Sequence, residues 1–172
     1  MKIAENLTEG LKYIFNNICG KIQQMVKWLL LPILLMPSLI FAQTCSLTNI
    51  SDVNFGLYDV ANATPTDTMG SATLTCTANI NATITLSSGL YANNFTSRYM
   101  KNQIFGDLLA YNLFTNVNRT SIWGDGTGGS SSVTIRVNRN KPPTLTIYAR
   151  IYAQQNVSIG NYSDTVIITV LP

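Results

Sequence analysis

The sequence predicts an all-β domain, an immunoglobulin-like antiparallel β-sandwich that lacks its final strand and follows an N-terminal signal peptide. Past residue 43, apolar and polar residues alternate with the period of two that half-buried strands require. Turn-forming residues divide this alternation into roughly seven short segments, which is typical of two packed sheets. Before it, residues 28–41 are almost wholly apolar.

Residues 1–42 form the predicted signal peptide region. The apolar stretch 28–41 follows the basic Lys21 and Lys27 and precedes Ala42, which predicts cleavage after Ala42. A retained membrane anchor is the weaker alternative, because the stretch is shorter than the ~20 residues of a spanning helix and contains two prolines.

A second methionine, Met25, offers a shorter leader. A start there gives Met-Val-Lys and then the apolar stretch directly. We therefore interpret residues 1–24 as a candidate gene-model extension, with Met1 as the alternative start. The mature chain is then residues 43–172, one domain without an internal repeat.

The cysteines agree with export. Cys19 lies upstream of the cleavage site, which leaves Cys45 and Cys76 as an even pair in a chain bound for an oxidising compartment. We expect a disulfide between them, worth about 3 to 4 kcal/mol for a loop of this length. The alternative, a lipidated Cys45, is disfavoured because Ala42-Gln43-Thr44 lacks the small-residue pattern of such processing.

The alternation identifies the strands in order. The clearest segment runs from Thr144 to Ala153, with Leu145, Ile147 and Ala149 on one face. Glycine, proline and asparagine clusters separate the segments. The predicted strands are 45–53, 73–76, 83–86, 109–114, 133–137, 144–153 and 165–170, and the turns are 62–70, 87–89, 124–129, 138–143 and 159–161.

The residue types needed for catalysis are scarce. The mature part contains no histidine and no glutamate, and both cysteines are expected in a disulfide, so we expect no enzyme, no metal and no cofactor. The glycine-rich segment 125–129 lacks the lysine of a phosphate loop and is interpreted as a turn. Seven basic and six acidic residues without a basic cluster give no support to nucleic-acid binding, and nothing indicates a small-molecule substrate.

An ordered set of short motifs resembles a known family, the spore coat protein U-like domains. The motifs span almost all of residues 45–172. They are the Cys45 start, Val53-Asn54-Phe55-Gly56-Leu57-Tyr58-Asp59, Leu74-Thr75-Cys76, Arg98-Tyr99-Met100, Leu109-Ala110-Tyr111-Asn112-Leu113-Phe114-Thr115, Ile122-Trp123-Gly124-Asp125-Gly126, Tyr148-Ala149-Arg150-Ile151 and Gly160-Asn161-Tyr162-Ser163-Asp164-Thr165-Val166.

The resemblance implies a subunit of archaic, Csu-type chaperone-usher pili that is not an enzyme. It further implies export to the periplasm, a place in the fimbrium at the cell surface, and a role in attachment and biofilm formation. The implied partners are a periplasmic pilus chaperone, an outer-membrane usher and neighbouring pilin subunits.

The predicted last strand ends close to Pro172. A sandwich that stops there has an open sheet edge beside an apolar groove, which a strand from another chain can fill. We expect the groove wall to be either Val166, Ile168 and Val170 or the opposite set, Ile167 and Leu171. The alternative is an ordinary edge strand of a complete sandwich.

The predicted mature N-terminus bears on the position in a fibre. Only Gln43 and Thr44 precede Cys45, and two residues span about 7 Å, too short to fill such a groove. This predicts a subunit that receives a strand without donating one, such as a terminal or tip-type subunit, or a truncated two-domain tip protein.

Two other functions stay open at this point. One is a self-contained secreted spore-coat or surface-matrix protein, whose sandwich closes on itself. The other is a carbohydrate-binding module with Trp123, Tyr91 or Tyr152 as a stacking platform. Core or loop packing is the favoured interpretation of Trp123.

Overall fold

The alternating sequence forms nine strands in residues 42–172, the part of the chain that the computed structural model describes. The predicted signal peptide region, residues 1–42, lies outside the described residues except for Ala42. The strands are β1 (Cys45–Ser51), β2 (Thr66–Cys76), β3 (Ile80–Leu86), β4 (Arg98–Asn102), β5 (Leu108–Phe114), β6 (Val133–Val137), β7 (Thr144–Ile151), β8 (Tyr162–Ser163) and β9 (Ile168–Leu171).

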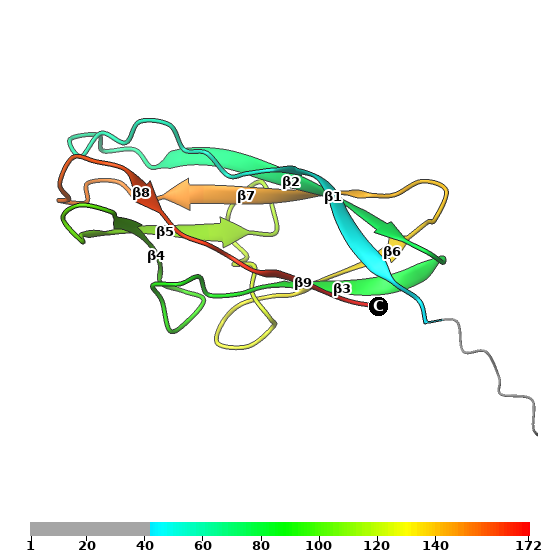
Figure 1. The fold of residues 1–172 in the computed structure, drawn as a ribbon. Coiled ribbons are helices and arrows are strands. Elements are labelled where there is room, and N and C mark those ends of the chain that lie inside the picture. The colour runs from blue at the N-terminus through cyan, green and yellow to red at the C-terminus, as the bar shows by residue number, and fades with distance from the viewer. Residues whose placement is uncertain (1–41) are drawn as a thin grey trace, which may run out of the picture. The chain divides into compact units, whose positions relative to one another are not determined.

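The strands form two antiparallel sheets, which confirms the predicted all-β sandwich (Figure 1). The larger sheet has the order β1-β2-β7-β5-β4-β8 and the smaller one has the order β6-β3-β9. At the centre of the larger sheet, β2 and β7 pair from Thr66 with Ile151 to Thr73 with Thr144. Every pairing between the named strands is antiparallel.

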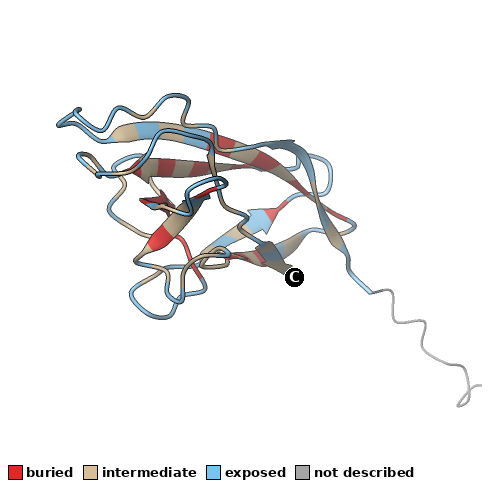
Figure 2. Ribbon diagram, turned by 60° about the vertical axis from the view of Figure 1, so that its left-hand side comes forward, coloured by how far each residue is buried: buried red, intermediate tan, exposed pale blue. Residues whose placement is uncertain are grey.

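Alternate residues of both sheets make the core (Figure 2). In β7, Leu145, Ile147 and Ala149 are buried while the residues between them are half-buried, as the sequence pattern predicts. β2 and β3 follow the same pattern. Each fully buried leucine or isoleucine contributes roughly 1.5 to 3 kcal/mol, so this alternation supplies most of the stabilisation of the sandwich.

Several predicted bounds were wrong. β2 begins at Thr66, inside the segment 62–70 that was predicted as a turn, and the first and last strands also differ from their predicted bounds. The segment predicted at 45–53 forms a strand only to Ser51. The segment predicted at 165–170 forms a strand only from Ile168, which then continues to Leu171.

Side chains explain the late start of β9. Asp164 Oδ1 accepts a hydrogen bond from the Thr165 N–H, and Ser87 Oγ accepts one from the Ile167 N–H. These side-chain acceptors take the place of a strand partner. The backbone therefore joins the ladder with β3 only after Ile167.

A buried arginine joins the loops to the larger sheet. Arg98 of β4 is fully buried and donates hydrogen bonds of 2.7 Å to the carbonyl oxygens of Ser87 and Trp123 and to Asn112 Oδ1. Burial lowers the pKa of this guanidinium. It has no ion pair within residues 42–172, so neutral oxygens satisfy its donors, and this makes each of them important for stability.

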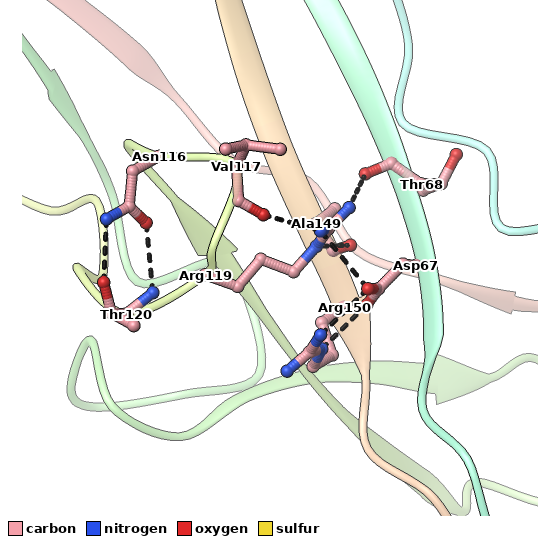
Figure 3. Close-up of polar contacts among 8 residues, drawn as sticks. All are labelled: Asp67, Thr68, Asn116, Val117, Arg119, Thr120, Ala149 and Arg150. Atoms are coloured by element: carbon pink, nitrogen blue, oxygen red, sulfur yellow. Dashed lines mark hydrogen bonds and ion pairs between the residues drawn. The ribbon is translucent and has the colours of Figure 1, made fainter.

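A second arginine, Arg119, ties the loop after β5 to the larger sheet (Figure 3). It donates hydrogen bonds to the carbonyl oxygens of Ala149 in β7 and Thr68 in β2, and it lies 3.2 Å from Asp67 Oδ2. Arg150 also binds Asp67 with two hydrogen bonds, and these hold the pKa of the Asp67 carboxyl below its ordinary value. The loop is therefore fixed on the outer face of the sandwich.

Candidate strand-accepting groove

Two sheet edges face each other across an open groove. Within residues 42–172, β1 pairs only with β2, and β9 pairs only with β3. Between these edges lies a groove of about 680 Å³. It is lined by Leu47, Val53, Val166 and Ile168 from the edges and by Leu86, Tyr111 and Leu113 from the core.

The β9 edge carries the two residue sets that the sequence left as alternatives. Val166, Ile168 and Val170 are half-buried and pack against the core, and the first two line the groove. Ile167 and Leu171 are 64% and 54% exposed, because they point to the outer face of the smaller sheet. The geometry thus places only the first set on the side of the groove.

The backbone of β9 is unpaired on the groove side. The Ser87 N–H donates a hydrogen bond of 2.9 Å to the Ile167 carbonyl oxygen, so Ile167 directs its polar backbone groups toward β3. In an antiparallel ladder these groups alternate in direction from one residue to the next. The N–H and C=O groups of Ile168 and Val170 therefore point to the open edge, where a further strand can bind.

The opposite edge has the same arrangement. The Thr77 N–H donates to the Thr44 carbonyl oxygen at 3.0 Å, which directs the polar backbone groups of Cys45 and Leu47 away from β2 and toward the open side. The Leu47 side chain packs against the core. Both edges thus combine inward apolar side chains with outward backbone donors and acceptors.

A disulfide fixes the start of the β1 edge. Cys45 and Cys76 are bonded, as predicted, and face each other in the pairing of β1 with β2. Because Cys76 is buried in the core, the bond fastens the edge strand β1 to its neighbour β2 in the larger sheet. It also leaves no free thiol at Cys45 for lipidation.

One end of the groove is polar. Tyr111 Oη donates a hydrogen bond of 2.6 Å to Asp164 Oδ2, and Asp164 Oδ1 accepts hydrogen bonds from the Leu90 and Thr165 N–H groups. Burial, together with this bond, raises the pKa of the Tyr111 hydroxyl well above its ordinary value. Asp52 lines the groove nearby and is exposed.

The surface role considered for Trp123 is wrong. Its ring is only 2% exposed, and its Nε1 donates a hydrogen bond of 3.1 Å to the Ile84 carbonyl oxygen. An indole inside the core with a satisfied N–H offers no face to a sugar. Trp123 is therefore a packing residue, in agreement with the favoured interpretation.

The loops between β1 and β2, between β4 and β5 and between β7 and β8 lie at the end of the sandwich opposite the C-terminus (Figure 1). These loops carry exposed apolar residues. Leu57 is 99% exposed, Ile159 is 91% exposed, and Ile104 and Phe105 are also exposed. The loops contact one another, because Asn102 binds both the turn at Ile104 and the carbonyl oxygen of Ile159. A second cavity of about 640 Å³ lies among these loops.

Sequence reasoning proposed groove-wall residues only on the β9 side and named none of the other residues that line the cavity. Leu47 and Tyr111 lie in predicted strands and Asp164 directly precedes one, yet no sequence signal showed that they line one groove. Their proximity depends on the order of strands in the two sheets, which alternation does not encode.

Two classes of site are absent from the described part of the chain. Residues 42–172 contain no group of three or more histidine, cysteine, aspartate or glutamate side chains that could hold a metal ion. The same residues contain no helix long and apolar enough to cross a membrane.

Comparison with known proteins gives a family and a fold. The Spore Coat Protein U domain matches residues 34–169. Protein U of Myxococcus xanthus is 34% identical over 128 residues, which are 69% of this chain and 70% of that protein. A chain in the chaperone–tip adhesion subunit pre-assembly complex from archaic chaperone-usher Csu pili of Acinetobacter baumannii has a TM-score of 0.52 at 23% identity. That match covers 75% of this chain but only 40% of the solved chain.

Proposed function

This chain belongs to the Spore Coat Protein U domain family, and from this premise we propose that it is a structural subunit of a chaperone-usher surface pilus. The subunit is assembled when a strand from another polypeptide fills the groove between β1 and β9. Its partners are a periplasmic chaperone, an outer-membrane usher and neighbouring subunits. Residues 1–42 direct export, and 43–172 form the pilus domain.

The observation that carries the proposal is the pair of open edges across one groove. Val166 and Ile168 on one edge and Leu47 on the other offer apolar surface, and the adjoining backbone offers hydrogen bonds. Such an edge promotes aggregation unless it is covered, and an extended peptide covers it through main-chain bonds and alternate side chains. The similarity in fold to a chain of a chaperone–subunit complex supports the same role.

Co-expression with a periplasmic chaperone of the chaperone-usher class tests this function. When it is made in cells without the chaperone, the exported protein is expected to aggregate or to be degraded, whereas co-expression yields a stable one-to-one complex. Dilute protein refolded in vitro stays in solution and serves for measurements on the lone protein. Val166→Asp and Ile168→Asp each place a charge in the groove and abolish the complex. Ile167→Asp, on the outer face of the same strand, is the matched control and leaves the complex intact. A lone monomer that stays soluble in cells and ignores the chaperone favours the self-contained coat protein instead.

The exposed loops favour a finer assignment, an attachment role at the free end of a fibre. Leu57, Ile104, Phe105 and Ile159 present apolar side chains to solvent at the end away from the C-terminus. Contiguous exposed apolar side chains are typical of surfaces that bind another surface. A subunit at the tip of a pilus can use them to attach cells and to start a biofilm.

Serine substitutions test the attachment role. The triple variant Leu57→Ser, Phe105→Ser and Ile159→Ser is expected to reduce cell attachment at an unchanged number of assembled pili. Met69→Ser with Val117→Ser removes exposed apolar side chains outside these loops and serves as the control. Equal attachment by both variants contradicts the role of the loops.

A further inference from the structure

The groove between β1 and β9 is apolar along most of its length, and two carboxylates lie at one end, called the acidic end, among apolar residues such as Val53 and Phe55. Ile168 and Leu86, which face each other in the pairing of β9 with β3, lie toward the apolar end together with Leu47. Four residues before Ile168, Asp164 lines the acidic end, and Asp52 lines it after β1. At about 3.3 Å per residue, the two ends of the β9 wall are roughly 13 Å apart.

The two carboxylates differ in the number of hydrogen bonds that they accept within the described part of the chain. Asp164 accepts hydrogen bonds from Tyr111 Oη and from two backbone N–H groups. Asp52 is exposed, and within residues 42–172 it has neither an ion pair nor a side-chain hydrogen bond. No lysine or arginine lines the groove. Asp164 lies within Coulombic range of the buried Arg98, whereas the negative charge of Asp52 has no ion pair in residues 42–172.

Filling the groove makes the unpaired carboxylate charge energetically more costly. An inserted strand displaces water from the groove, and electrostatic interactions become stronger as water leaves. A basic side chain beside Asp52 then gains a charge pair, while an acidic one meets repulsion. The apolar part of the groove accepts many alternating apolar strands, so the charge beside Asp52 adds a means of discriminating between them.

We propose that the strand that fills this groove carries a lysine or arginine at the end that lies beside Asp52, and that this charge pair contributes to the selection of that strand. This inference rests on the proposed function and adds to it the chemistry of the partner. Asp52 is thereby a specificity-determining residue for strand addition, and the apolar stretch from Leu47 to Ile168 supplies most of the affinity.

Capped synthetic peptides of alternating valine and threonine test the inference on the purified exported protein. One peptide is uncharged, one has a lysine near its N-terminus, one has the lysine near its C-terminus, and two have glutamate at these positions. Binding is measured by fluorescence anisotropy at low and high salt. Asp52→Asn removes the charge at the groove. Asp59→Asn is the matched control, because Asp59 is exposed, lies outside the groove, and as asparagine still accepts a hydrogen bond from the Ala61 N–H.

One of the two lysine peptides is expected to bind roughly three- to tenfold tighter than the uncharged peptide. The glutamate peptide of the same end binds more weakly, and high salt reduces both effects. Asp52→Asn abolishes the gain and Asp59→Asn preserves it. Equal binding of all peptides, or a gain that persists in Asp52→Asn, overturns this inference and leaves strand acceptance intact. Failure of every peptide to bind contradicts the proposed function itself.

Discussion

Tyr111 and Asp164 connect the middle of the larger sheet to the segment that leads into β9, through a hydrogen bond of 2.6 Å between the Tyr111 hydroxyl and Asp164 Oδ2. The same carboxylate holds the Leu90 and Thr165 N–H groups. One half-buried carboxylate thus positions the polar end of the groove.

Tyr111→Phe removes the hydroxyl and keeps the ring. Because a partly buried carboxylate loses one donor, the free energy of unfolding is expected to fall by about 1 to 2 kcal/mol. Guanidinium unfolding of the exported protein measures the change. Tyr99→Phe is the control, since the Tyr99 hydroxyl has no hydrogen-bond partner in the described residues, and it is expected to have little effect.

The same variant tests the pH dependence of stability. The pKa of Tyr111 is raised in the folded state, so at alkaline pH the unfolded chain releases this proton first. The contribution of the tyrosine is complete below its unfolded pKa near 10 and falls as pH rises above it. The stability difference between wild type and Tyr111→Phe is therefore expected to stay constant up to about pH 10 and to shrink between about pH 10 and pH 12. A constant difference over this range contradicts the assignment.

The close packing of Gly89 against the Asp164 carboxylate leads to a further prediction. Gly89 has a φ of +91°, and a Cβ atom added there overlaps Asp164 Oδ2. Gly56 also has a positive φ, +68°, but a Cβ atom there meets nothing within 4 Å. Both alanine variants carry the backbone strain of a positive φ, so only Gly89→Ala adds the clash. Thermal unfolding is expected to show a clearly larger loss for Gly89→Ala, and equal losses disagree with the described position of Asp164.

Arg98→Met tests the buried arginine. The substitution leaves the oxygens of Ser87, Trp123 and Asn112 without their donor inside the core, and we expect a loss of about 3 to 5 kcal/mol in the free energy of unfolding. Arg136→Met changes an exposed arginine of β6 and should stay within about 0.5 kcal/mol of wild type. If both variants behave alike in chemical denaturation, Arg98 does not hold these loops.

The disulfide is expected to stabilise the domain by about 3 to 4 kcal/mol, in line with the 31-residue separation of Cys45 and Cys76. The double variant Cys45→Ser, Cys76→Ser should lose this amount in denaturant unfolding. Wild type in excess dithiothreitol should match it, while the double variant should not respond to dithiothreitol. Unchanged stability on reduction shows that β1 is held by its other contacts.

The sequence analysis predicted those features that depend on neighbouring residues. Alternation located β7 almost to the residue, because both faces of Thr144–Ile151 follow one regular ladder. It missed β4, where the buried Arg98 and Asn102 interrupt the apolar pattern. From sequence alone, a charged residue at a core position is assigned to the surface, because its distant hydrogen-bond acceptors are not known.

The candidate site could be predicted only in part for the same reason. The alternation at Val166, Ile168 and Val170 showed that one face of the last strand is buried but did not show which partners it meets. Trp123 carries a ring that suits sugar binding, and only its burial excluded that role. Contacts between residues far apart in sequence, such as Tyr111 with Asp164, come from the order of the sheets.

The central claim is that β9 has an unfilled side that accepts a strand from another chain. Amide hydrogen exchange at single-residue resolution tests it most directly. The internal references are Ile167, whose N–H donates to Ser87 Oγ, and Thr169, whose N–H faces β3. The N–H groups of Ile168 and Val170 are expected to exchange fast in the lone protein and to become protected in the complex with the chaperone. Slow exchange of Ile168 and Val170 in the lone protein, at the level of Thr169, would contradict the account.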